Sequence, residues 1–118
     1  MTTPADLAAW GARSPSERPR HVVIVGAGRV GTEVADRLPD TWSVGVVDVD
    51  PAAEARIREL RPDATFVTGD GSSRLTLAGC GLTRASVLIA ATPSPAVNRE
   101  AARVARAHFG VEIGRAHV

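Results

Sequence analysis

The feature that most constrains the fold is a glycine-rich run, Gly26-Ala27-Gly28-Arg29-Val30-Gly31. It follows a continuous apolar stretch at residues 21–25 and precedes Val30, Val34 and Leu38, which repeat at helical spacing. Glycines recur by chance, but a strand, this glycine pattern and a helix in sequence form the first unit of a Rossmann fold. The pattern therefore predicts a βα turn that can approach phosphate groups closely.

The rest of the chain alternates short apolar runs with helical patterns, which is typical of repeated βα units on a parallel sheet. Further strands are expected at residues 42–49, 64–68, 86–91 and 111–118, with helices at about 51–61, in the segment that ends at Gly79 or Gly81, and at 96–109. Right-handed crossovers then predict an open α/β sheet of strand order 3-2-1-4-5, with helices on both faces.

Prolines and their neighbours mark the helix ends. Pro39 should end the first helix. Asp50 and Pro51, and again Ser94 and Pro95, fit the cap and first position of the helices that follow them. Each cap lies within three residues of the end of an expected strand, which supports the alternating pattern.

The 118 residues suffice for one domain with its own core. We place the Rossmann-type domain at residues 20–118. Residues 1–19 contain Pro4, Pro15 and Pro19 among polar residues, and we expect an N-terminal arm that is partly disordered.

Composition excludes several function classes. The chain has no apolar run of about 18 residues and no signal-peptide pattern at its start, so we expect a cytoplasmic protein without direct membrane insertion. Its net charge is +1 and its arginines are spread among acidic residues, which argues against nucleic-acid binding. Cys80 is the single cysteine, so an internal disulfide or a zinc site built on cysteine pairs is excluded.

Within the turn, each glycine has an expected task. Gly26 permits the tight turn, Gly28 removes the Cβ that would block the phosphates, and Gly31 allows the helix to pack on the strand. Free N–H groups and the helix dipole attract phosphate charge. We therefore place the phosphates on residues Gly26–Gly31; the alternative is a glycine-rich turn that binds nothing.

Asp48 is the second candidate, at the end of the second strand and 22 positions after Gly26. That spacing is close to the roughly 20 residues that separate the turn from the ribose-binding acid. A carboxylate there accepts ribose hydroxyls and repels a 2′-phosphate, so NAD(H), ATP or ADP is favoured over NADP. Val49, the next residue, is a candidate for the same nucleotide site. The alternative is that Asp48 only caps the turn into the next helix.

Loops after the other strands should complete the site. Asp70, followed by Gly71 and Ser72, can accept a hydrogen bond from an adenine amino group, or it can serve the turn instead. Ala91 and Thr92, with Asn98, are candidates for the far side of the cleft.

Arg29 can contact a terminal phosphate in a bidentate way, or can be solvated. The histidines, His21, His108 and His117, belong to no recognisable base, nucleophile or metal set. We therefore expect binding without catalysis.

With these residues in place, the chain resembles the N-terminal nucleotide-binding domain of TrkA-type potassium transport regulators, also called the RCK or KTN domain. The resemblance covers residues 20–118. It rests on four segments: Val23–Gly31, Val46–Asp50, Thr68–Ser72 with Leu77-Ala78-Gly79, and Leu88–Thr92 with Asn98. The sequence departs from the family in two respects: Pro93-Ser94-Pro95 replaces acidic residues that often follow the threonine, and the sequence stops at the fifth expected strand, without the family's sixth strand or ligand-binding C-terminal domain.

This resemblance implies a cytosolic regulatory module that binds NAD(H), ATP or ADP and forms a homodimer. It also implies control of a membrane potassium channel or transporter, which would hold the module at the inner face of the membrane. Two other hypotheses remain open: an NAD-binding subunit or fragment of an oxidoreductase, and an interaction module that has lost its ligand.

Overall fold

The computed structural model describes residues 20–115 of the chain. The expected N-terminal arm at residues 1–19 and the end of the expected fifth strand at 116–118 lie outside the described residues.

The described residues form one parallel sheet of five strands. These strands are β1 (His21–Val25), β2 (Ser43–Asp48), β3 (Thr65–Thr68), β4 (Val87–Ala90) and β5 (Glu112–Arg115). Their spatial order is β3-β2-β1-β4-β5, which confirms the predicted order. Because all strands run in the same direction, their carboxyl ends meet at one edge of the sheet.

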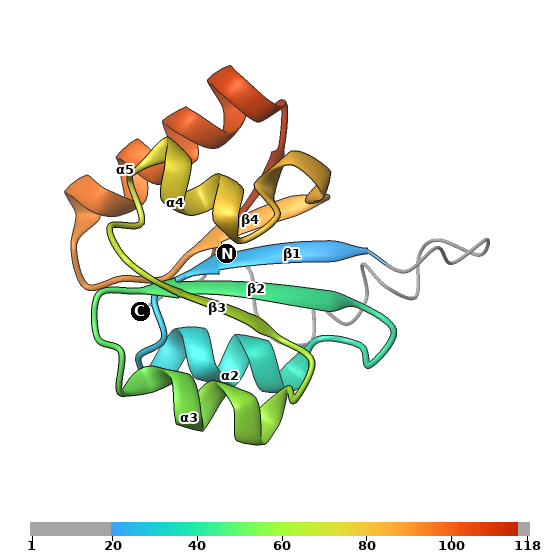
Figure 1. Ribbon diagram of the computed structural model, residues 1–118. Helices are drawn as coiled ribbons and strands as arrows, with labels where there is room; N and C mark the ends of the chain where they lie inside the picture. Colours follow the sequence, from blue (N-terminus) through green and yellow to red (C-terminus); the bar gives the residue numbers. More distant parts are fainter. Residues whose placement is uncertain (1–19, 116–118) are drawn as a thin grey trace.

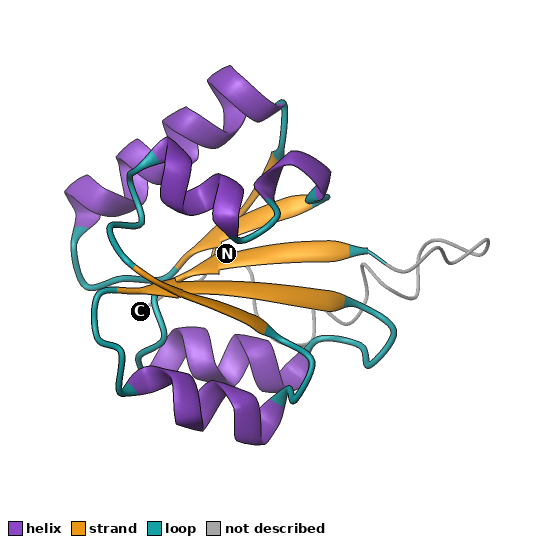
Figure 2. Ribbon diagram, viewed as in Figure 1, coloured by secondary structure: helices purple, strands orange, loops and turns teal. Residues whose placement is uncertain are grey.

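Helices cover both faces of the sheet (Figures 1 and 2), as predicted. The helical elements are α2 (Arg29–Arg37), α3 (Ala53–Leu60), α4 (Arg74–Gly79), the 3₁₀ turn η1 (Leu82–Arg84), α5 (Pro95–Val104) and the π-helical turn η2 (Ala105–Phe109). In Figure 1, α2 and α3 lie below the sheet, and α4 and α5 lie above it. None of the helices in residues 20–115 is long and apolar enough to cross a bilayer.

The central strand β1 serves two hydrophobic cores because successive side chains point to opposite faces. Val22 and Ile24 belong to the cluster under α2 and α3, whereas Val23 and Val25 belong to the cluster under α4 and α5. All five residues of β1 are buried. The continuous apolar run in the sequence thus reflects a strand covered on both sides.

The helix boundaries differ slightly from the predicted ones. At the start of α5 the prediction is confirmed: the Ser94 hydroxyl accepts a hydrogen bond from the Val97 N–H at 3.2 Å, and Pro95 is the first helical residue. The start of α3 was predicted at Pro51 but lies at Ala53. Asp50 instead accepts a hydrogen bond from the Ala52 N–H at 2.9 Å, which holds a turn before the helix.

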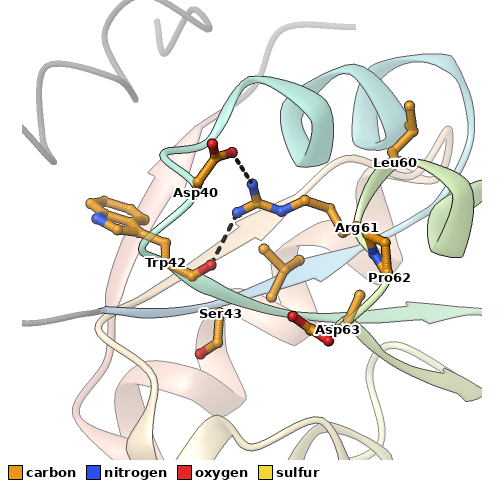
Figure 3. Close-up of a pocket in the computed structure, with 9 residues that line it drawn as sticks. Asp40, Trp42, Ser43, Leu60, Arg61, Pro62 and Asp63 are labelled. Carbon is orange, nitrogen blue, oxygen red and sulfur yellow. Dashed lines mark hydrogen bonds and ion pairs between the residues drawn. The ribbon is translucent and has the colours of Figure 1, made fainter.

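At the sheet edge opposite the carboxyl ends, Arg61 anchors the end of α2 (Figure 3). Its guanidinium donates hydrogen bonds of 3.0 to 3.1 Å to the carbonyls of Leu38, Pro39 and Trp42, and lies 3.7 Å from Asp40. A cavity of about 230 Å³ surrounds these groups. Arg61 thus holds the loop between α2 and β2 and satisfies the carbonyl of Leu38, the C-cap of α2.

Candidate functional site at the carboxyl edge of the sheet

The carboxyl ends of β1, β2, β3 and β4 are tied together by backbone hydrogen bonds. The Gly26 N–H donates to the Val47 carbonyl at 2.7 Å, and the Ala91 N–H donates to the Val25 carbonyl at 2.8 Å. The Gly69 N–H donates to the Asp48 carbonyl at 2.9 Å. These bonds place the loops that follow the four strands beside one another.

A cavity of about 410 Å³ opens among these loops. It is lined by Val25, Gly26, Gly28, Val47, Asp48, Val49, Gly69, Asp70, Gly71, Ala91, Thr92, Pro93, Ser94 and Val97. Residues far apart in sequence, from the glycine turn to the start of α5, thus share one site. Its volume is within the range of pockets that hold small molecules and cofactors.

Eight residues predicted from the sequence line this cavity. They are Gly26, Gly28, Asp48, Val49, Asp70, Gly71, Ala91 and Thr92. The other five predicted residues, Ala27, Arg29, Val30, Gly31 and Ser72, support the turn or face elsewhere. The structure therefore separates residues at the cavity from residues that shape it.

The structure gives a different account of each of the three glycines in the turn. Gly26 has φ +106°, and a Cβ there would lie 2.8 Å from the Ala91 carbonyl oxygen. A Cβ on Gly31 would collide with the Gly26 carbonyl. Gly28 has an ordinary φ of −78°, and a Cβ built on it meets nothing within 4 Å. Packing within the described chain requires glycine at positions 26 and 31 but not at 28.

The start of α2 is available to an anion. Gly28 is its N-cap, no side chain caps the helix, and its first turn carries no acidic residue. The first N–H groups of an α-helix have no partner within the helix, and they attract negative charge. The turn therefore has the electrostatics of a phosphate site.

Asp48 is half-buried beside this turn. One carboxylate oxygen, Oδ2, accepts a hydrogen bond from the Ala27 N–H at 2.7 Å, and Oδ1 accepts one from the Asp50 N–H at 2.9 Å. Each carboxylate oxygen has a second lone pair. Asp48 can therefore hold the turn and still accept hydrogen bonds from ribose hydroxyls, so its structural and ligand-binding roles are compatible.

Asp70 is exposed at the end of β3 and organises its own loop. Its Oδ1 accepts hydrogen bonds from the Ser72 N–H at 2.8 Å and the Ser72 hydroxyl at 2.7 Å. The side-chain bond from Ser72, followed by the backbone bond, lowers the pKa of Asp70. Ser73, rather than Asp70, caps α4. The next residue, Gly71, has no room for a Cβ because Val25 packs against it.

Thr92 is fixed by Asn98 after β4. The Asn98 Oδ1 accepts hydrogen bonds from the Thr92 hydroxyl at 2.6 Å and the Thr92 N–H at 3.1 Å, and its Nδ2 donates to the Thr92 carbonyl at 3.0 Å. Asn98 was expected to line the cleft, but it does not line the cavity. It anchors the loop that presents Thr92, Pro93 and Ser94.

Val30 and Arg29 face away from the cavity. Val30 packs against the core under α2 and α3. Arg29 is exposed and lines an open groove of about 600 Å³ between α2 and α3, which also includes Gly28. Gly28 lines both hollows, whereas Arg29 lines the groove and not the cavity.

Sequence reasoning missed several residues that the structure brings to the site. Pro93, Ser94 and Val97 line the cavity, and their place after β4 could have indicated them. Arg56 of α3 donates a hydrogen bond to the Ala27 carbonyl at 2.8 Å, and the Thr32 hydroxyl donates to the same carbonyl at 3.1 Å. No local pattern marks Arg56, because its position depends on how α3 packs beside α2.

The described histidines lie away from the cavity. His21 is buried at the start of β1, where its ring bonds Ser43 and the Cys80 carbonyl, and His108 is exposed on η2. His117 lies outside the described residues. Residues 20–115 contain no cluster of three or more side chains suited to hold a metal ion.

The fold is that of a Rossmann-type domain. The glycine turn, Asp48 at the end of β2 and the cavity at the carboxyl ends of the strands are features of the nucleotide-binding class of this fold. Residues 22–117 match the model of the TrkA-N domain. The chain therefore belongs to the TrkA-N domain family, which agrees with the resemblance found in the sequence.

Curated relatives carry the same domain within longer chains. The chain is 39% identical over 93 residues to the Trk system potassium uptake protein TrkA of Streptomyces coelicolor, covering 78% of this chain and 41% of the relative. It is 38% identical over 91 residues to the protein of the same name from Azorhizobium caulinodans, covering 76% and 20%. The chain thus spans less than half the length of these relatives.

Solved structures share the fold. The Kef CTD of Shewanella denitrificans in its AMP-bound form matches with a TM-score of 0.70 at 23% identity, over 80% of this chain and 57% of that one. The TrkA-N domain of the Escherichia coli inner membrane protein YbaL matches with a TM-score of 0.66 at 24% identity, over 84% and 73%. A saccharopine dehydrogenase from Saccharomyces cerevisiae reaches 0.67 at 17% identity, over 84% and 22%, which shows only that the fold is shared.

Proposed function

We propose that this domain is a regulatory module that binds an adenine nucleotide, NAD(H) or ATP/ADP, and controls a potassium channel or transporter. The nucleotide occupies the cavity at the carboxyl edge, with its phosphates on the Gly26–Gly31 turn. In this proposal the domain binds and releases its ligand without transforming it.

The observation that carries the proposal is the free space at Gly28. Its φ of −78° suits any residue, and a Cβ would meet nothing within 4 Å. Glycine there leaves the start of α2 open on the side of the cavity, where a phosphate would need close approach to the backbone. Because packing among the described residues does not require glycine at position 28, the proposal gives it a physical reason in the close approach of a ligand.

The shape of the ligand follows from the neighbouring groups. Asp48 retains lone pairs for ribose hydroxyls and would repel a 2′-phosphate. The apolar side chains of Val49, which is 75% exposed, and Val97 offer surface to a base. An adenine nucleotide with a free ribose fits these features, and the AMP-bound state of the Shewanella structure supports this class.

The role in potassium transport rests on the family and on the names of its curated relatives. A module of this kind acts in the cytoplasm, pairs with a second copy, and reaches the inner face of the membrane through the transporter it regulates. Nucleotide binding at the cavity would change the position of the surrounding loops and so pass a signal to that partner.

Calorimetric titration of the chain with NADH, NAD, ATP, ADP and NADPH in turn tests the proposal. We expect saturable binding of at least one ligand with a free ribose, and weaker binding of NADPH. Asp48→Ala should weaken the best ligand by about 1 to 3 kcal/mol, as expected for losing hydrogen bonds to a charged group. Absence of binding to every ligand in the set would refute the proposed function.

A further inference from the structure

Ala27 anchors the phosphate turn through both of its backbone polar groups. Ala27 is 1% exposed, and its N–H donates to Asp48 Oδ2 at 2.7 Å. Its carbonyl accepts hydrogen bonds from Arg56 at 2.8 Å and from the Thr32 hydroxyl at 3.1 Å. Two donors can use both lone pairs of a carbonyl oxygen. The turn is thus held from β2, α2 and α3 together.

The direction of this carbonyl fixes the direction of the next N–H. The described residues contain no cis peptide bond, and in a planar trans peptide the C=O and N–H groups point in opposite directions. With the Ala27 carbonyl held by Arg56 and Thr32, which both line the α2–α3 groove, the Gly28 N–H faces away from that groove. Gly28 also lines the cavity at the sheet edge.

We propose that Arg56 is a positioning residue of the phosphate turn, which fixes the Ala27–Gly28 peptide so that the Gly28 N–H is presented to the phosphate of a bound nucleotide. This inference rests on the proposed function for its ligand. A donor held in place before binding strengthens affinity because less ordering remains to be done when the ligand arrives.

Four variants separate positioning from general charge. Arg56→Met removes the donor but keeps an unbranched stem, and Arg56→Lys restores a donor of similar reach. Thr32→Val removes the second bond to the same carbonyl without changing any charge. Arg37→Met is the matched control, because Arg37 lines the same groove and is 60% exposed in a pair with Glu33.

Titration with ADP by calorimetry gives the affinities. We expect Arg56→Met to weaken ADP binding by about tenfold, the equivalent of one hydrogen bond in a polar site. Arg56→Lys should recover most of this loss, Thr32→Val should lose affinity in the same direction, and Arg37→Met should bind ADP as the parent does. Unchanged affinity in Arg56→Met, or an equal loss in Arg37→Met, would overturn the inference.

A second readout does not depend on any ligand. In ligand-free protein labelled with ¹⁵N, the Gly28 amide resonance should move in Arg56→Met and in Thr32→Val but stay in place in Arg37→Met, with the circular dichroism of the parent retained. A Gly28 amide that does not respond would refute the positioning role. If the parent fails to bind ADP or any other nucleotide, the proposed function fails, while this spectrum still decides whether Arg56 orients the turn.

Discussion

At the scale of single residues, the glycines of the turn separate fold from function. Gly26 and Gly31 are required because a Cβ at either would collide with backbone atoms. Among the described residues, nothing lies within 4 Å of a Cβ on Gly28, so glycine there fits the close approach of a ligand. This distinction gives a substitution that can remove binding without disturbing the fold.

We predict that Gly28→Val abolishes nucleotide binding while the protein stays folded. The valine side chain would occupy open space in the free protein and the position of the phosphate in the complex. Circular dichroism and calorimetric titration with the ligand that binds the parent most tightly provide the measurements. A folded Gly28→Val protein that binds this ligand normally would show that the phosphates lie elsewhere.

At the scale of elements, His21 links β1 to its neighbours. Its Nε2–H donates to the Cys80 carbonyl at 2.7 Å, and its Nδ1 lies 2.7 Å from the Ser43 hydroxyl of β2. Burial lowers the pKa of His21 from 6.5; the bond to Cys80 opposes this shift and the charge of Arg84 adds to it. The folded protein therefore favours the neutral ring.

This shift predicts a loss of stability on acidification. Below pH 6.5 the unfolded chain binds a proton at His21 that the folded chain resists, so the free energy of unfolding decreases as pH falls from 6.5 toward the folded pKa. Urea unfolding at several pH values from about 7.5 to about 5.5 measures this slope. His21→Gln should flatten it, and an identical slope in both proteins would contradict the role of His21.

Some elements and site residues can be predicted from the sequence, and others cannot. The strand order, the glycine turn and Asp48 follow from local patterns, because each depends on residues adjacent in the chain or on the general geometry of βα units. The role of Asn98 does not, because its amide turns back to hold Thr92 instead of facing the cavity. Arg56 escapes prediction for a related reason, since only the packing of α3 beside α2 brings it to Ala27.

Boundaries are predictable to within a few residues, for a physical reason that α3 illustrates. Asp50 and Pro51 suit the start of a helix, yet the Asp50 carboxylate bonds the Ala52 N–H and forms a turn that delays α3 until Ala53. Ser94 and Pro95 carry the same signal, and α5 begins at Pro95 as expected. A capping residue followed by proline thus has two outcomes: the Ala52 N–H that bonds Asp50 precedes α3, whereas the Val97 N–H that bonds Ser94 lies within α5.

At the scale of the whole molecule, β5 is an outermost strand of the described sheet, with β4 on one side and no strand on the other. Exposed strand edges are usually covered, and twofold pairing is the commonest way for a homo-oligomer to form. We predict a homodimer through α5, η2 and β5. Val104 of α5 is 4% exposed and packs in the core, so this contact must use the exposed residues of these elements.

Sedimentation over a dilution series checks this prediction, with Ala107→Arg as the interface variant. Ala107 is exposed on η2, next to the exposed Arg106, so an added arginine brings bulk and like charge to the proposed contact without entering the core. The parent should form dimers that dissociate on dilution, and Ala107→Arg should dissociate at higher concentration. A parent that is monomeric at every concentration would contradict the homodimer.

The most direct measurement of the central claim is a map of the bound nucleotide by ¹⁵N–¹H spectra of the labelled chain. In the described residues, one hollow lies at the glycine turn, at the carboxyl ends of the strands, and another lies around Trp42 and Arg61, at the opposite ends of the strands (Figure 3). Saturation with the tightest ligand should shift the amides of Gly26–Gly31, Asp48 and Thr92 most, and leave those around Arg61 in place. Shifts concentrated at the Arg61 cavity, with the glycine turn unmoved, would contradict the account.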